Sequence, residues 1–259
     1  MTSDRDRMKR AASVMAVAEV QSGMKLGLGT GSTMDFALDE IARRIREEGL
    51  QVAGIPTSRV TEARALRLGI PLTSFAETET LDLAIDGADE LLPGTLTVIK
   101  GLGGALLRER IVAAAARRFV VIADGSKIAD RFASVAPVPI EVVPFGHEST
   151  ARRLAKLGLR PVLRLDGNGA PVMTDGGHFL YDAHDVDAGT EPEALATALR
   201  QTVGVIDNGI FIRMVTEAIV AETPTVILRL KAESSTVQAF RHFDDISHGV
   251  SPTRDEVRD

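Results

Sequence analysis

Short aliphatic runs alternate with helical patterns along the first half of the chain, and Gly-rich turns join several of them. Helical spacing of apolar residues is clear at 34–45, 60–68 and 104–118. Strands are predicted at KLGL (25–28), QVAGI (51–55), LDLAI (81–85), LTVI (96–99) and FVVIA (119–123). Strands that alternate with helices predict a doubly wound parallel sheet with right-handed crossovers.

Composition agrees with this layered arrangement. Of the 259 residues, 44% are hydrophobic but only 4% are aromatic, and Trp is absent. The core must therefore be aliphatic, as in buried parallel strands. A chain of this length can form one large domain or two modest ones.

The pattern changes near Ala133, where PVPIEVV (137–143) starts a second unit. Helices are predicted at about 147–157 and 191–201, with Gly-containing hairpins between them. We therefore predict an α/β protein with an open, mostly parallel, Rossmann-like sheet and an inserted, smaller α+β domain of ferredoxin-like type. The predicted limits are 1–131 and 207–244 for the sheet domain, 132–206 for the insertion, which would act as a lid or in oligomerisation, and 245–259 for a disordered tail, with TVILRL (225–230) as the last strand.

Charge and residue content exclude several classes of protein. The net charge is −6 and no basic cluster suggests a nucleic-acid partner. Because the chain has no Cys, disulfides and thiolate chemistry are excluded. There is no run of about 18 apolar residues for a membrane span, and the first ten residues are too polar for a secretory signal. We expect a soluble, cytoplasmic protein that binds neither nucleic acid nor membrane.

The stretch GLGTGST (27–33) lies between a predicted strand and a predicted helix. It has Ser32 where a dinucleotide fingerprint needs its last Gly, and it has no Gly-Lys pair for a P-loop. Backbone N–H groups and the hydroxyls of Thr30, Ser32 and Thr33 could bind an anion at the helix N-terminus. An ordinary Ser/Thr helix cap explains the same residues equally well.

Two further turns carry charged residues. KGLGGALLRER (100–110) places Lys100 after a strand and Glu109 on a helix, where both could simply be solvated. ADGSK (123–127) could hold a phosphate with Ser126 and Lys127, or could be a polar turn.

AIDGADEL (84–91) concentrates Asp86, Asp89 and Glu90, which could form a solvated turn, a metal site or acid–base machinery. An EF-hand would need more oxygen ligands at fixed offsets, and they are absent. We expect no metal here, because none of the histidines lies in these motifs: His147, His178, His184, His242 and His248.

The polar residues share a position relative to the strands. Thr30, Asp86, Asp89, Lys100 and Lys127 each follow a predicted strand. In a parallel sheet, all five would lie on one rim, where ligands bind. Lysines and Gly-rich turns beside carboxylates on that rim suggest a phosphorylated substrate and proton transfer.

Six motifs in this order resemble the type A family of ribose-5-phosphate isomerases: GLGTGST, GIPTS, AIDGADEL, VIKGLGGALLRE, ADGSK and GVIDNGIF. The resemblance covers roughly residues 6–230. It implies an enzyme that interconverts ribose 5-phosphate and ribulose 5-phosphate through an enediolate, without metal or cofactor. It also implies a homodimer or homotetramer whose small-molecule partner is a sugar phosphate.

The resemblance also assigns roles residue by residue. Glu109 would be the base between C2 and C1, Asp86 would assist ring opening, and Asp89 would hold substrate hydroxyls. Lys100 would stabilise the enediolate oxygen. The resemblance leaves Glu90 unexplained, and we expect it to be a structural cap or to support the residues of the site. The expected substrate-binding and phosphate-binding residues are Lys9, Thr30, Gly31, Ser32, Thr33, Gly101, Gly103 and Lys127.

One departure and three alternatives remain. Leu102 interrupts the glycine run that often follows the family's lysine. A paralogue could isomerise another sugar phosphate, because hydroxyl recognition depends on pocket shape. A non-catalytic sugar-phosphate sensor would need a DNA-binding segment and the loss of Glu109 or Lys100. A coenzyme A transferase relative would need its glutamate in a different motif.

Overall fold

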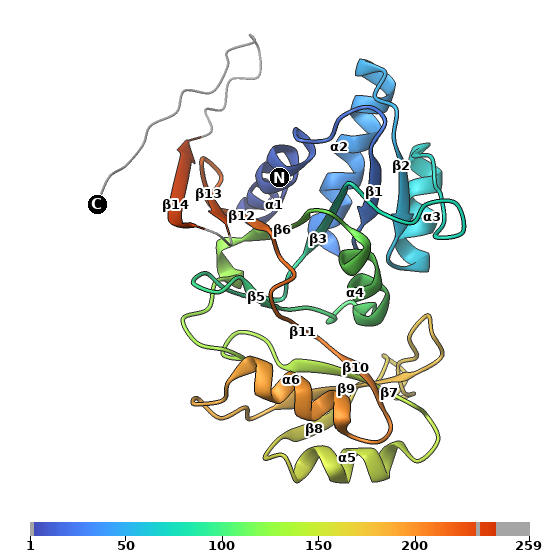
Figure 1. Ribbon diagram of the computed structural model, residues 1–259, viewed down its shortest axis with the longest axis vertical. Helices are drawn as coiled ribbons and strands as arrows, with labels where there is room; N and C mark the ends of the chain where they lie inside the picture. Colours follow the sequence, from blue (N-terminus) through green and yellow to red (C-terminus); the bar gives the residue numbers. More distant parts are fainter. Residues whose placement is uncertain (1–2, 232–233, 242–259) are drawn as a thin grey trace.

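Seven strands form the main sheet of the computed structural model, which describes residues 3–231 and 234–241. The strand order is β14-β13-β12-β6-β3-β1-β2 (Figure 1). The strands from β12 to β2 run parallel, while β13 and β14 continue from β12 as antiparallel neighbours. Their bounds are β1 Lys25–Leu28, β2 Ala53–Pro56, β3 Leu83–Gly87, β6 Phe119–Asp124, β12 Glu217–Thr223, β13 Val226–Lys231 and β14 Ser234–Arg241.

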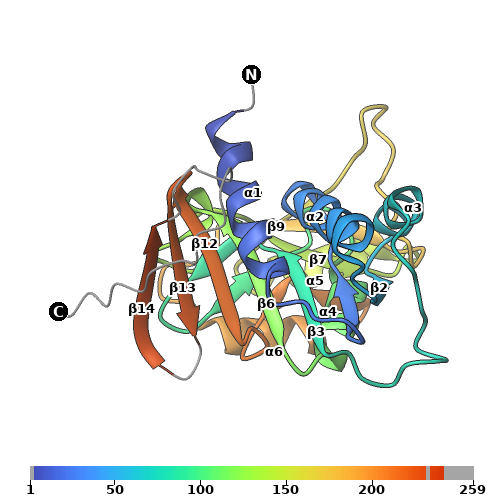
Figure 2. The ribbon, with the colours of Figure 1, turned by 90° about the horizontal axis from the view of Figure 1, so that it is seen from above.

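Helices cover both faces of this sheet, which confirms the predicted doubly wound class (Figure 2). One face packs against α1 (Asp4–Val17), α2 (Ser32–Glu48) and α3 (Arg59–Leu68), largely through aliphatic side chains. The other face packs against α4 (Leu106–Ala115) and a small sheet. The aliphatic composition thus supplies two cores, one on each face of the sheet.

The predicted strand at 96–99 does not join the parallel sheet, and this part of the prediction was wrong. Residues Thr97–Ile99 form β5, which pairs antiparallel with β4 (Glu90–Leu92) and with β11 (Ile210–Phe211). The link between β4 and β5 is too short for the crossover that a parallel neighbour requires, so the chain turns back on itself. Lys100 therefore reaches the site from this three-stranded sheet.

The inserted unit has the predicted α+β, ferredoxin-like arrangement. Its antiparallel sheet has the order β10-β7-β9-β8, and its elements follow the chain order βαββαβ. Strand β10 extends past the predicted limit at 206, and the division into domains remains a prediction. The bounds are β7 Val138–Val142, α5 His147–Ala155, β8 Arg160–Leu163, β9 Phe179–His184, α6 Pro192–Gln201 and β10 Val205–Asn208.

The end of the chain differs from the prediction. The run at 225–230 was expected to be the last strand, but β14 follows β13 and pairs with it. The sequence places β14 so close behind β13 that an antiparallel hairpin is the available pairing. The tail predicted at 245–259 lies outside the described residues. In the part of the chain that the structure describes, no helix combines the length and the apolar character that crossing a membrane demands.

Candidate active site

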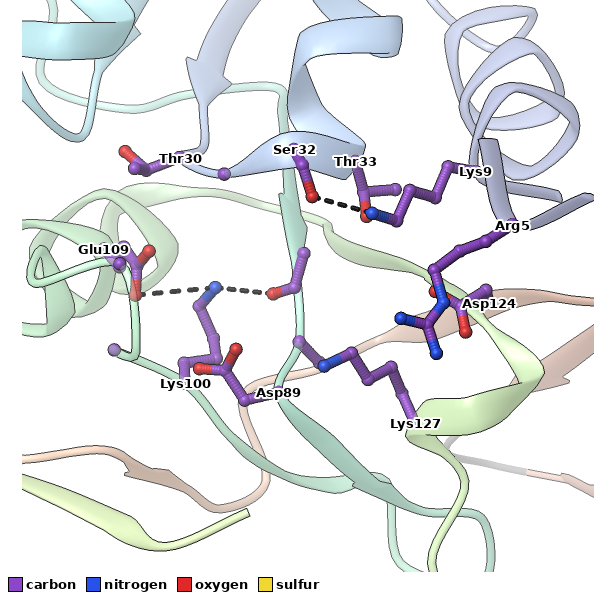
Figure 3. Close-up of a pocket in the computed structure, with 15 residues that line it drawn as sticks. Arg5, Lys9, Thr30, Ser32, Thr33, Asp89, Lys100, Glu109, Asp124 and Lys127 are labelled. Carbon is purple, nitrogen blue, oxygen red and sulfur yellow. Dashed lines mark hydrogen bonds and ion pairs between the residues drawn. The ribbon is translucent and has the colours of Figure 1, made fainter. Parts of the chain in front are cut away.

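A cavity of about 140 Å³ lies at the carboxyl ends of β1, β3 and β6. Its walls come from α1, the β1–α2 turn, the end of β3, the β5–α4 turn and the short helix η1 (Gly125–Lys127). Figure 3 shows a carboxylate-rich end near Glu109 and a basic end near Lys127. This is the edge at which ligands bind in open α/β sheets.

Three buried charged side chains form the carboxylate-rich end. The Nζ atom of Lys100 lies 2.9 Å from Oδ2 of Asp86 and 3.5 Å from Oε2 of Glu109. It also donates a hydrogen bond of 2.6 Å to the Gly87 carbonyl. Exposed fractions of 2% for Asp86 and Lys100 and 4% for Glu109 exclude the solvated alternatives for the lysine and the glutamate. Buried charges of this kind need partners, and each finds one in this cluster.

Backbone groups fix the Asp86 carboxylate. Its Oδ1 atom accepts hydrogen bonds from the N–H groups of Thr30 at 3.0 Å and Gly87 at 2.7 Å. Gly29 lies so close that a Cβ atom there would be 2.1 Å from Oδ1 of Asp86. Position 29 must therefore be glycine, because any side chain there would collide with Asp86. The β1–α2 turn forms the wall that holds the carboxylate.

Glu109 faces the cavity from the first turn of α4. Its Oε2 atom has no hydrogen-bond partner among the described residues, because Lys100 lies at ion-pair distance only. The neighbouring Arg110 points away and anchors α4, with its guanidinium stacked over Phe211 at 4.1 Å. That guanidinium also donates to the Asp207 carboxylate and to the carbonyls of Asn208 and Ile210.

The two carboxylates compete for one ammonium group. Burial raises the pKa of Glu109 to about 8, against the opposing effect of Lys100 and with the help of the Asp86 and Asp89 charges. Burial also raises the pKa of Asp86. It would lower the pKa of Lys100, but the carboxylates of Asp86 and Glu109 outweigh it and raise that pKa. Asp86 lies closer to Nζ of Lys100 and accepts hydrogen bonds from two N–H groups, which favour its ionised form. Of the two carboxyl groups, Glu109 is therefore the one that carries a proton.

Asp89 connects the end of β3 to the glycine-rich turn. It lines the cavity, and its Oδ2 atom accepts a hydrogen bond of 2.9 Å from the N–H of Leu102. Gly101 has a φ of +104°, which only glycine adopts readily. The side chain of Leu102 is 39% exposed, so this departure from the family pattern changes nothing that faces the cavity.

The opposite end of the cavity is basic. Lys9 of α1 donates a hydrogen bond of 2.8 Å from Nζ to Oγ of Ser32, at the N-terminus of α2. Lys127 enters from η1, and Arg5 lies 3.4 Å from the Ser126 hydroxyl (Figure 3). Two flexible cations, an arginine fork and the N–H groups of a helix terminus suit a phosphate dianion.

The comparisons with known proteins agree on one family. The sequence model of ribose 5-phosphate isomerase A (phosphoriboisomerase A) matches residues 53–224. Ribose-5-phosphate isomerase A of Synechococcus sp. strain JA-3-3Ab is 49% identical over 216 residues, which cover 83% of this chain and 94% of that protein. This chain belongs to the ribose 5-phosphate isomerase A family.

Two solved isomerases have the same fold as this family member. Ribose 5-phosphate isomerase from Plasmodium falciparum is 35% identical, with a TM-score of 0.84 over 88% of this chain and all of that one. A D-ribose-5-phosphate isomerase in complex with phospho-erythronic acid is 32% identical, also with a TM-score of 0.84 and the same coverage.

In this isomerase family member, the structure brings the sequence-predicted site residues together around one cavity. Asp86 does not line the cavity itself, but it forms an ion pair with Lys100, which does. The Thr30 hydroxyl turns away from the basic end, toward other hydroxyls (Figure 3). The remaining predicted residues line the cavity: Lys9, Thr30, Gly31, Ser32, Thr33, Asp89, Lys100, Gly101, Gly103, Glu109 and Lys127.

Sequence reasoning missed four lining residues: Arg5, Gly87, Ala88 and Asp124. Arg5 precedes Lys9 by one helical turn, so the two share a face of α1. That spacing could have identified Arg5. The other three lie in motifs that were recognised, but the sequence does not show which backbone groups or side chains of a motif face the cavity.

Glu90 has the structural role expected for it. It is 1% exposed and accepts hydrogen bonds from the N–H groups of Ala133, Val135 and Ala136. It thus holds the segment that leads into the ferredoxin-like unit. Within residues 3–231 and 234–241, no three or more Asp, Glu or His side chains form a group that could hold a metal ion.

Proposed function

We propose that this chain interconverts D-ribose 5-phosphate and D-ribulose 5-phosphate, as the name of its family indicates. The observation that carries the proposal is the buried Asp86–Lys100–Glu109 cluster, which shares a cavity with a basic end. One solved relative is in complex with phospho-erythronic acid, and a phosphorylated ligand fits this division of the cavity.

The phosphate would bind at the basic end, between Lys9, Lys127 and the N-terminus of α2. Binding there anchors the substrate away from the reacting carbons and limits its orientations. C1 and C2 would then lie at the carboxylate-rich end. Asp86 would assist ring opening and Asp89 would hold substrate hydroxyls.

Proton transfer would use Glu109 and Lys100. The Glu109 carboxylate would take the proton from C2 and return it to C1, while a hydroxyl proton moves from O2 to O1. Lys100 would stabilise the negative oxygen of the enediolate, as a preorganised cation in a dry site. The cytoplasmic location, the homodimeric or homotetrameric assembly and the independence from metals remain predictions.

Ketose formation from ribose 5-phosphate by the purified protein tests this function. The assay should contain EDTA and a panel of other aldose phosphates. We expect turnover that prefers ribose 5-phosphate. Turnover only on another sugar would keep the mechanism and change the substrate, and no turnover by folded protein would reject the proposal.

The pKa of Glu109 predicts the pH dependence. A base works only when ionised, so kcat/KM should rise as the pH passes through about 8. The substrate phosphate has a second pKa of about 6, so measurements from about pH 7 to 9.5 keep it a dianion. A profile that is flat or falls over this range would contradict the role of Glu109.

A further inference from the structure

The motif GIPTS (54–58) has no part in the proposed chemistry, yet it ends in two buried hydroxyls. Thr57 is 1% exposed and Ser58 is 6% exposed. Together with Thr61, they surround Oγ1 of Thr30 at 2.7, 2.8 and 3.0 Å. Three hydroxyls gathered around that of Thr30, a residue that lines the cavity, indicate a structural role for the cluster.

The donors in this cluster follow one direction. The Thr30 hydroxyl donates to Ser58, and Ser58 donates to Thr61 at 3.1 Å. Thr61 in turn donates to the Gly29 carbonyl at 2.9 Å. Because a hydroxyl has a single proton, Thr57 must donate to Thr30. The chain of hydrogen bonds therefore begins at Thr57, just after β2, and ends on the backbone of the β1–α2 turn.

That same piece of backbone holds the Asp86 carboxylate. Gly29 presses against Asp86, and the N–H of Thr30 donates to its Oδ1 atom. Asp86 in turn holds Lys100, which lies beside Glu109. A shift of the turn would thus be transmitted to all three charged groups.

We propose that the hydroxyls of Thr57, Ser58 and Thr61 position Asp86 through the backbone of Gly29 and Thr30. They are positioning residues, because they act through the turn and have no contact with reacting atoms. In this interpretation, Thr30 helps to hold Asp86 through its N–H group, and its hydroxyl is bonded within the cluster. The phosphate is then bound by the residues of the basic end. The inference rests on the proposed function and deepens it.

Thr61→Val tests the chain at its last bond. Valine keeps the shape but removes the donor to the Gly29 carbonyl. We expect kcat to fall about 10- to 100-fold, as a misplacement of about 1 Å can cause, while KM stays nearly constant. Thr61→Ser should restore most of the activity. Thr57→Val, which removes only the first donor, should act in the same direction, and it replaces Thr61→Val if that variant fails to fold.

Thr150→Val is the matched control. Thr150 is a buried threonine on α5 whose hydroxyl donates to the Val203 carbonyl at 3.3 Å, far from the cavity. It should lower the melting temperature like the other valine variants but leave kcat unchanged. A Thr61→Val enzyme that loses stability and keeps its kcat would overturn the inference. An equal loss of kcat in Thr150→Val would overturn it too.

A second readout needs no substrate. Carbon-13 titration of labelled aspartates should show a higher pKa for Asp86 in Thr61→Val, because a shift of the turn weakens the hydrogen bond from the Thr30 N–H to the Asp86 carboxylate. An unchanged Asp86 titration would contradict the positioning role. If the wild-type protein fails to isomerise ribose 5-phosphate, the proposed function falls, and this titration still decides the inference.

Discussion

Glu109→Gln is expected to lower kcat by about 10²- to 10⁴-fold, the range that general base catalysis contributes. The amide keeps the shape of the side chain but cannot take the C2 proton. KM should change little, because the substrate is anchored at the other end of the cavity. Steady-state kinetics, together with exchange of the ketose C1 proton in D₂O, measures both effects. A loss of less than about tenfold would remove Glu109 from its role as base.

The same variant should be more stable than the wild type above neutral pH. Because the pKa of Glu109 is raised to about 8 in the folded state, the folded protein holds a proton that the unfolded chain has released above about pH 4.5. The stability of the wild type relative to Glu109→Gln should therefore fall as the pH rises from about 4.5 to about 8. Urea unfolding at several pH values measures this difference.

Glu217→Gln provides the matched control for Glu109→Gln. Glu217 is 3% exposed and forms ion pairs with Arg118 and Arg229. It begins β12, at the opposite end of the parallel strands from the cavity. Its replacement should lower stability and leave kcat unchanged. Equal losses of kcat in both variants would show that burial, and no specific role of Glu109, explains the effect.

Lys100→Met should lower both kcat and the stability of the fold. Loss of a preorganised charge partner for the enediolate oxygen should lower kcat about 10²- to 10³-fold. Removing one partner of a buried ion pair should also reduce the free energy of unfolding by about 3–5 kcal/mol, because the Asp86 carboxylate remains without a counter-charge. The destabilisation should be smaller near pH 5, where the carboxyls can take up protons.

Two further variants separate these effects. The double variant Lys100→Met with Asp86→Asn removes the uncompensated charge, so it should recover stability but no activity. Lys127→Met makes the same replacement at the basic end, where the side chain is half-buried. It should raise KM for ribose 5-phosphate with little change in stability. A double variant that regains turnover would exclude Lys100 from the chemistry.

The local pattern of the sequence was enough for most of the fold. Aliphatic runs such as FVVIA at β6 predicted buried parallel strands, because strands covered on both faces have no polar alternation. The same reasoning was wrong for strand β5, which is not part of the parallel sheet. Three buried residues look alike in a parallel sheet and in a small antiparallel one, and only the pairing with β4 and β11 distinguishes the two.

For the site, the residue types and their order identified the chemistry, but they did not determine the environment of each group. Glu109 lies between two arginines in the sequence and looked like a surface residue. Its burial, and with it a pKa of about 8, results from α4 packing beside Lys100 and the end of β3. Desolvation depends on what surrounds a side chain in space, and sequence neighbours do not reveal that.

The sequence by itself determined the family, the alternation of strands and helices, and the set of polar residues at the carboxyl ends of β1, β3 and β6. Those are local properties, carried by spacing and residue type. The tertiary structure alone decided that Lys100 comes from a second sheet and that Thr30 turns its hydroxyl toward Thr57 and Ser58. These outcomes depend on contacts between segments distant in the chain, because packing and hydrogen bonding act on proximity in space.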